Sequence, residues 1–255
     1  MSEKAKKTVL AMDTALGGVS VGIMAANGHI VSRMEETSRG QAAMLVPMIQ
    51  EVLAEAQTGF DQLDLIACSI GPGSFTGLRI GLSTARTLGL ALNIPVVGLN
   101  TLDVMARHYC ISPNPQAEGP VCSSSSAQAR GRDDTGKSLL IVLETKRQDF
   151  YARYYDIDGQ PLGEPVAANG SVILGSAPKE PFSVGGDCLN RFQQVVSGDF
   201  ECLDELTQPD PILMAQIGLE IYENNGDQGI PQPLYLRGAD VSQPKTPPRK
   251  LEQAS

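Results

Sequence analysis

The order of apolar segments predicts an α/β fold built on a mixed β-sheet with helices on its faces. The first hundred residues begin with strand-like runs joined by a hairpin turn at Asn27-Gly28, and they continue as alternating helices and buried strands. Antiparallel strands followed by β-α-β units give a mixed sheet. With 42% hydrophobic residues in 255, the chain can bury the core of one large domain or two modest ones.

Each element of the first half has its own signal. Apolar runs of strand length predict the strands, and apolar residues at i, i+3 and i+4 predict the helices. The expected strands cover residues 8–12, 19–25, 29–35, 63–70 and 94–98, and the expected helices cover 41–57, 76–92 and 101–108.

A segment rich in proline and serine separates this half from a second one, which restarts with a strand. We therefore expect an N-terminal lobe at residues 1–108, a linker at 109–136, a C-terminal lobe at 137–237 and a disordered tail at 238–255. The strands of the second lobe are expected at 138–143, 149–156, 164–168 and 182–184. A helix at about 211–224 is a candidate to pack back on the first lobe.

The composition excludes several classes of function. The 20 Lys and Arg residues against 29 Asp and Glu give a net charge of −9, so the chain alone is a poor nucleic-acid binder. Two histidines exclude a His-rich metal site. The longest apolar runs fall short of the ~20 residues of a membrane span, and the five cysteines form no CxxC pair, so we expect a cytoplasmic protein.

A carboxylate and a hydroxyl follow the first expected strand. Asp13 and Thr14 stand at its end, and Gly17 and Gly18 lead into the next strand. Such a pair at the mouth of a hairpin can hold a metal-bound phosphate. It can equally cap its own strand end by bonding local amides, and the sequence leaves both interpretations open.

A glycine-rich turn joins the strand at 63–70 to the helix at 76–92. Free amides at a helix N-terminus favour anions. The turn lacks the lysine of a phosphate-binding P-loop and the dinucleotide-binding fingerprint, so a tight capped turn is the competing interpretation. Together with Asp13 and Thr14, the candidates for a vestigial phosphate site are Gly71, Gly73, Ser74, Thr76 and Gly77.

Two helix surfaces are candidates for a partner interface. On the helix at 76–92, small residues recur every four positions, which permits close approach of another helix; these are Gly77, Gly81, Ala85 and Gly89. On the helix at 41–57, Met44 is expected on the solvent side and Met48 at its edge. Methionine adapts to irregular partner surfaces. The alternative is that both helices pack only within their own domain.

The sequence offers no recognisable catalytic constellation. His29 and His108 are far apart, and neither has a second histidine at i+3 or i+4. Neither histidine has a nucleophile elbow nearby, so a peptidase is the least favoured class of enzyme.

Four sequence blocks together resemble one known family. The runs are VLAMDTALGGVSVGI, GPGSFTGLRIGLSTARTLGLALNIPVVGLNTLDVMA, DFYARYY and PLYLRGADV. They are similar to the TsaB (YeaZ) family, the dimerisation subunit of tRNA threonylcarbamoyladenosine biosynthesis and a glycoprotease-like branch of the actin-like ATPase superfamily. The resemblance covers residues 8–110 closely and 138–240 more loosely.

The resemblance implies an actin-like ATPase (ribonuclease H-like) fold with two lobes, each a mixed five-stranded sheet flanked by helices. It implies a non-catalytic subunit that heterodimerises through its first two helices with the catalytic paralogue TsaD. The complex forms threonylcarbamoyladenosine at position 37 of tRNAs that read ANN codons. TsaD binds a metal through an HxxxH helix motif, whereas residues 38–50 of this chain contain no histidine.

The resemblance also sets expectations for cofactors and further partners. ATP and a metal ion are expected on TsaD and none on this chain alone, with a nucleotide at the interface as a further option. A TsaE-type ATPase belongs to the wider complex, tRNA is contacted indirectly, and a homodimer is the alternative in isolation. An actin-like ATPase or kinase acting through Asp13, Thr14 and the glycine-rich turn remains the competing function.

Overall fold

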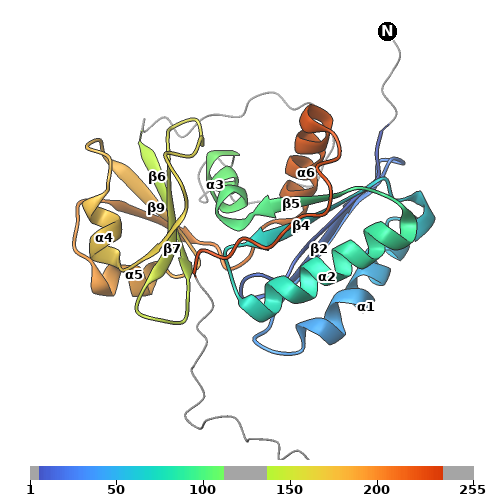
Figure 1. Ribbon diagram of the computed structural model, residues 1–255, viewed down its shortest axis with the longest axis horizontal. Helices are drawn as coiled ribbons and strands as arrows, with labels where there is room; N and C mark the ends of the chain where they lie inside the picture. Colours follow the sequence, from blue (N-terminus) through green and yellow to red (C-terminus); the bar gives the residue numbers. More distant parts are fainter. Residues whose placement is uncertain (1–5, 112–136, 238–255) are drawn as a thin grey trace, which may run out of the picture.

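The computed structural model describes residues 6–111 and 137–237, which form two lobes side by side (Figure 1). The predicted tail and most of the predicted linker, from residue 112 to 136, lie outside the described residues. The limits proposed for the two lobes therefore stay predictions.

The first lobe is built on a five-stranded mixed sheet in the order β3-β2-β1-β4-β5. Strands β1, β2 and β3 are antiparallel neighbours, while β4 lies parallel to β1 and β5 lies parallel to β4. Its strands are β1 (Val9–Asp13), β2 (Gly18–Met24), β3 (Ile30–Glu36), β4 (Leu65–Gly71) and β5 (Val96–Asn100).

The second lobe repeats this topology. Its sheet has the order β10-β9-β6-β7-β8, with β6, β7 and β8 antiparallel and β6, β9 and β10 parallel. Its strands are β6 (Ser138–Glu144), β7 (Phe150–Tyr155), β8 (Val166–Ala168), β9 (Phe182–Gly186) and β10 (Glu201–Glu205). The predicted fold class, two lobes with mixed five-stranded sheets and flanking helices, is confirmed.

Helices cover both faces of each sheet. In each lobe, one of the covering helices comes from the part of the chain that builds the other lobe. Helices α1 and α2 cover one face of the first sheet, whereas α6 covers the other face (Figure 1). In the second lobe, α4 and α5 pack on one face and α3 packs on the other. The helices are α1 (Gln41–Glu55), α2 (Phe75–Leu92), α3 (Thr101–Ile111), α4 (Gly170–Gly175), α5 (Leu189–Val195) and α6 (Pro211–Asn225), with a 3₁₀ turn at Phe60–Gln62.

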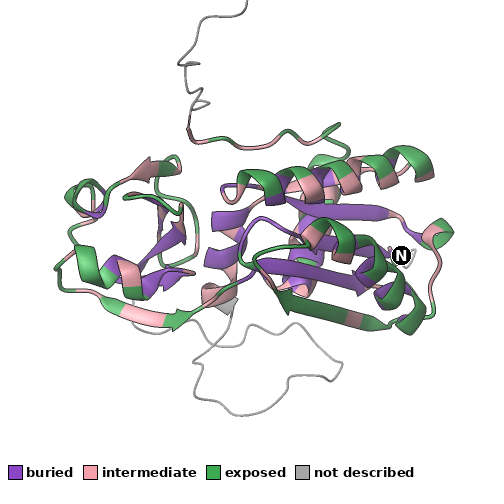
Figure 2. Cartoon of the chain, turned by 90° about the horizontal axis from the view of Figure 1, so that it is seen from below, coloured by how far each residue is buried: buried purple, intermediate pink, exposed green. Residues whose placement is uncertain are grey.

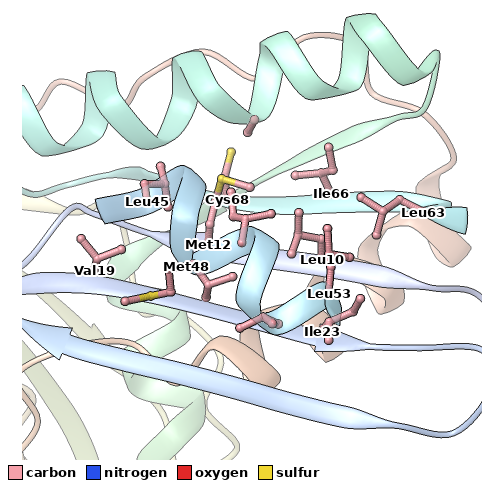
Figure 3. Packing of buried hydrophobic residues seen from close by; sticks show 14 of the residues in the cluster. Leu10, Met12, Val19, Ile23, Leu45, Met48, Leu53, Leu63, Ile66 and Cys68 are labelled. Atoms are coloured by element: carbon pink, nitrogen blue, oxygen red, sulfur yellow. The ribbon is translucent and has the colours of Figure 1, made fainter. Parts of the chain in front are cut away.

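The alternation of side chains along β1 explains why its sheet is covered on both faces. Leu10 and Met12 point into the core shared with α1 and α2 (Figure 3), whereas Val9 and Ala11 point into the core shared with α6. All four side chains are fully buried. Figure 2 shows the same contrast, with buried strands between helices whose outer faces are exposed.

Helix α6 begins where its sequence predicts. The Asp210 carboxylate accepts hydrogen bonds from the amides of Ile212 and Leu213, and Pro211 occupies the first helical turn. Gly218 brings α6 close to β4, since a Cβ at this position would lie 2.6 Å from the Cβ of Ala67. The C-terminal helix is therefore a structural part of the first lobe's core.

The small-residue stripe of α2 faces its own sheet. All four members are buried, and a Cβ on Gly77 would lie 1.8 Å from the carbonyl oxygen of Thr14. A Cβ on Gly81 would lie 2.6 Å from the Thr14 hydroxyl, and one on Gly89 would lie 2.4 Å from Val96. The structure therefore corrects the expectation that Gly77, Gly81, Ala85 and Gly89 form an exposed partner surface; they allow close packing within the lobe.

Every helix and strand expected from the sequence is present, with ends displaced by a few residues. Helices α4 and α5 and strand β10 were not expected. The two helices have six and seven residues, and β10 is largely exposed with the sequence ECLDE. Such short elements carry too few turns or alternations for a periodic pattern to appear.

No helix among the described residues is long and apolar enough to cross a membrane.

Substituting Gly77 by Ala should destabilise the protein by about 2–3 kcal/mol, because the new methyl group would overlap the Thr14 carbonyl. Gly175→Ala is the matched control: this glycine ends α4, and a methyl group added there would have no heavy atom within 4 Å. Urea unfolding measures both variants. Equal stabilities for the two would contradict the close contact between α2 and the end of β1.

Candidate functional site

A cleft of about 820 Å³ lies between the two lobes. Its first wall is the turn after β1, with Ala15 and Leu16, together with the N-terminal end of α2. Its second wall is the hairpin between β6 and β7 and the residue after β9, Asp187. Four cationic side chains line it: Arg79, Lys146, Arg147 and Arg237.

The glycine-rich turn reaches this cleft only in part. Gly73, Ser74 and Thr76 line it, whereas Gly71 and Gly77 are buried and do not. The Ser74 amide donates to the Ala15 carbonyl at 2.7 Å, and the Ser74 hydroxyl accepts the Gly77 amide at 3.3 Å. Two amides that could bind an anion at the start of α2 thus already have protein partners.

Asp13 and Thr14 lie behind this wall and are 1% and 2% exposed. One Asp13 carboxylate oxygen accepts the Ala15 amide at 3.2 Å, and the Thr14 hydroxyl donates to the Gly77 carbonyl at 2.7 Å. Burial raises the pKa of Asp13, against the opposing effects of the Ser69 hydroxyl and nearby amides. A carboxyl that does not reach the cleft is not placed to bind Mg²⁺ there.

These two residues therefore fix α2 against the end of β1 and do not face the cleft. The arrangement does not fit the ATP and Mg²⁺ that an actin-like ATPase would need, because neither the Asp13 carboxylate nor the Thr14 hydroxyl lines the cavity. The capping interpretation of this motif is the one that matches the geometry.

The second lobe contributes an equivalent turn that the sequence reasoning missed. Glu144 ends β6 and Thr145 follows it, as Asp13 ends β1 and Thr14 follows it, and both Glu144 and Thr145 line the cleft. The Thr145 hydroxyl lies within hydrogen-bond distance of two acceptors on Asp149, the backbone carbonyl at 2.7 Å and the carboxylate at 2.8 Å. Glu144 pairs with Arg191 at 2.8 Å. The repeated strand–acid–threonine order was the available signal.

Among the titratable groups that line the cleft, Asp187 has the pKa that departs most clearly from its ordinary value. Its Oδ1 accepts the Glu144 amide at 2.7 Å. Burial raises its pKa to about 6, and the charge of Glu144 adds to the increase, while hydrogen bonds from the Glu144 amide and Cys188 oppose it. The cleft therefore changes its charge in mildly acidic solution.

The outer surfaces of α1 and α2 form a second candidate site. Met48 is 9% exposed and belongs to the core (Figure 3), and Met44 is half-buried against the same core. The structure thus corrects the expectation for Met48, whereas Met44 stays partly exposed and its place in a partner interface remains a prediction. The exposed apolar side chains are instead Val46 on α1 and Phe75 and Leu90 on α2. We name these three residues the docking face.

The histidines have structural surroundings. A ring nitrogen of His29 lies 3.1 Å from the Ala56 carbonyl, and the His108 ring packs edge-on against Tyr109. Among the residues that the structure describes, no three His, Cys, Asp or Glu side chains gather where they could hold a metal ion.

Comparisons with known proteins converge on one group. Residues 16–131 match the family model described as TsaD, tRNA N6-adenosine threonylcarbamoyltransferase. An uncharacterised protein of Mycobacterium tuberculosis is 30% identical over 94% of this chain and 97% of its own length. The protein TsaB of Escherichia coli, named for tRNA threonylcarbamoyladenosine biosynthesis, is 35% identical over 39% of this chain.

Some of these similarities cover less than half of the relative's length, and a solved structure shows how far the fold is shared. The aligned segment spans 42% of the Escherichia coli TsaB and 41% of an uncharacterised Mycobacterium leprae relative. The structure of YeaZ from Pseudomonas aeruginosa superposes with a TM-score of 0.70 at 21% identity, over 91% of this chain and 100% of that one. This last similarity shows a shared fold.

Asp187→Asn should flatten the dependence of stability on pH. The pKa of Asp187 lies above its ordinary 3.8 in the folded chain, so folding binds a proton and wild-type stability falls as pH rises from about 4 to about 6. Asparagine keeps the Oδ1 acceptor but does not titrate. We expect the variant to gain about 1–3 kcal/mol over wild type between pH 4 and pH 7 in urea unfolding.

The control is Asp204→Asn, which changes an exposed aspartate on β10. A constant stability difference between Asp187→Asn and wild type across this pH range would show that Asp187 titrates normally.

Proposed function

The chain belongs to the TsaD/YeaZ (TsaB) family, and from this membership we propose that it is a non-catalytic subunit of a tRNA-modifying complex. It heterodimerises with a catalytic paralogue of the TsaD type and is required for threonylcarbamoyl transfer to adenosine 37 of tRNA. ATP and the metal ion are held by that partner, a TsaE-type ATPase joins the wider complex, and the complex works in the cytoplasm.

The observation that carries this proposal is the docking face. Val46, Phe75 and Leu90 are 46%, 54% and 85% exposed, on two helices that contact each other on one side of the first sheet. Large apolar side chains at the surface of a helix pair are typical of protein interfaces. A helix pair of the partner, packed on α1 and α2, would remove these side chains from water.

The charge of the chain supports an indirect role in tRNA binding. A net charge of −9 opposes contact with phosphates unless cations are clustered. The partner would then supply most of the basic surface that holds the tRNA.

The competing function, an ATPase or kinase acting alone, depends on Asp13, Thr14 and the glycine-rich turn. The burial of the first two and the engaged amides of Ser74 and Gly77 speak against it. Calorimetric titration of the isolated chain with ATP and Mg²⁺ decides between the two. Binding tighter than the millimolar range would favour the independent enzyme.

Val46→Asp should weaken co-purification with the TsaD-type partner at least tenfold, because it places a charge in an apolar interface. The side chain is exposed, so the fold should tolerate the change, unlike a charge at the buried Met48. Threonylcarbamoyl transfer to tRNA by the mixed subunits should fall in parallel.

Val195→Asp is the matched control, since Val195 is a similarly exposed valine on α5 of the second lobe. An undiminished complex with Val46→Asp, or transfer by this chain without any partner, would overturn the proposal.

A further inference from the structure

The chain that follows α6 returns across the molecule as an extended segment. Residues 230–237, which we name the strap, leave the first lobe and end beside β7 of the second lobe, as the red segment of Figure 1 shows. The strap contains no helix or strand of its own. Its position is therefore set by contacts with the two lobes.

The first half of the strap is bound to the first lobe through its main chain. The Leu234 amide donates to the Ile70 carbonyl at 2.7 Å, and the Arg86 guanidinium of α2 donates to the Pro231 carbonyl. Arg86 also reaches the Gln232 side chain at 3.2 Å. Together these bonds hold the strap between β4 and α2.

Two glycines make this close approach sterically feasible. A Cβ on Gly71 would lie 2.9 Å from the Leu234 carbonyl oxygen, and one on Gly98 would lie 2.7 Å from Pro231. Any side chain at either position would push the strap away from the sheet. Gly71, expected from the sequence to bind phosphate, therefore serves the strap instead.

The middle of the strap meets the start of α2 at the edge of the cleft. The rings of Tyr235 and Phe75 have centroids 5.5 Å apart, and the Arg79 guanidinium lies 3.9 Å from the centre of the Phe75 ring. Phe75 also belongs to the docking face. The strap thus contacts one residue of that face.

The end of the strap is held by the second lobe. Arg237 forms an ion pair with Asp149, and its guanidinium lies 5.7 Å from the centre of the Tyr151 ring. The two charged side chains are about one-quarter exposed. Asp149 is itself fixed by Thr145 in the hairpin that lines the cleft.

We propose that the strap is a clamp between the lobes, with the Arg237–Asp149 ion pair as its releasable end. The Leu234 amide, the Arg86 side chain and two close glycine contacts fix the strap to the first lobe. In contrast, the Asp149 carboxylate and the Tyr151 ring hold its last residue on the second lobe. A partly exposed ion pair is weaker than such an anchor and is screened by salt. Release of Arg237 leaves the hairpin 144–149 held by Arg191 and Asp187 and lets the strap leave the second lobe.

The clamp also links the cleft to the docking face. Tyr235 lies two residues before Arg237 and contacts Phe75, so a partner that covers Phe75 also holds Tyr235 and favours the closed clamp. This second step rests on the proposed function, whereas the clamp itself does not.

Hydrogen exchange followed by mass spectrometry on the full-length isolated chain tests the clamp. In Arg237→Ala and in Asp149→Asn, amide exchange in the hairpin 144–149 and in the strap should rise about fivefold, and Arg237→Lys should restore part of the protection. High salt should raise wild-type exchange in the same peptides. Circular dichroism verifies that each variant is folded.

Arg107→Ala is the matched control, because it removes another exposed ion pair, with Glu220 at 3.4 Å, away from the strap. The clamp would be overturned, whether or not the partner binds, by either of two results. One is that Arg237→Ala exchanges its strap and hairpin amides as slowly as wild type; the other is that Arg107→Ala raises their exchange equally. Addition of the TsaD-type partner to wild type should lower strap exchange; unchanged exchange in a formed complex would overturn the link to the docking face.

Discussion

The contact between α2 and the end of β1 fixes the helix that the cleft, the strap and the docking face all use. Gly77 places the helix so close to Thr14 that no side chain would fit, and the Thr14 hydroxyl closes the contact by donating to the Gly77 carbonyl. This contact determines where the first wall of the cleft stands. It also turns Phe75 outward and presents Arg79 and Arg86 to the strap.

The same contact occupies the place where a relative with nucleotide chemistry would need open polar groups. Asp13 is buried with a raised pKa, and the Ser74 amide is bound to Ala15. Tight packing of a helix on a strand end and an accessible phosphate site compete for the same atoms. In this chain these atoms are engaged in packing contacts, which agrees with the proposed non-catalytic role.

The sequence predicts the elements well because most of them are long enough for a period to appear. The small-residue stripe also showed correctly that something approaches α2 closely, but a helix and a strand end leave the same pattern. Met48 was expected at the edge of the solvent side of α1 but is buried. The buried face of α1 is wide, and its edge depends on the elements packed against the helix, which the sequence of the helix alone does not give. The turn at Glu144 was missed because the repeated order of strand, acid and threonine is short, and its two copies stand out only once the two sheets are seen to share one topology.

The exchange of α3 and α6 between the lobes has a consequence for biosynthesis. The strands of the first sheet precede those of the second in the chain, yet one face of the first sheet is covered by α6, which follows the last strand of the second lobe. Val9, Ala11 and Ala67 therefore lack the cover of α6 until the strands of the second lobe have been synthesised. The lobe made first completes its core last, and during that interval its open apolar face is a natural substrate for chaperones.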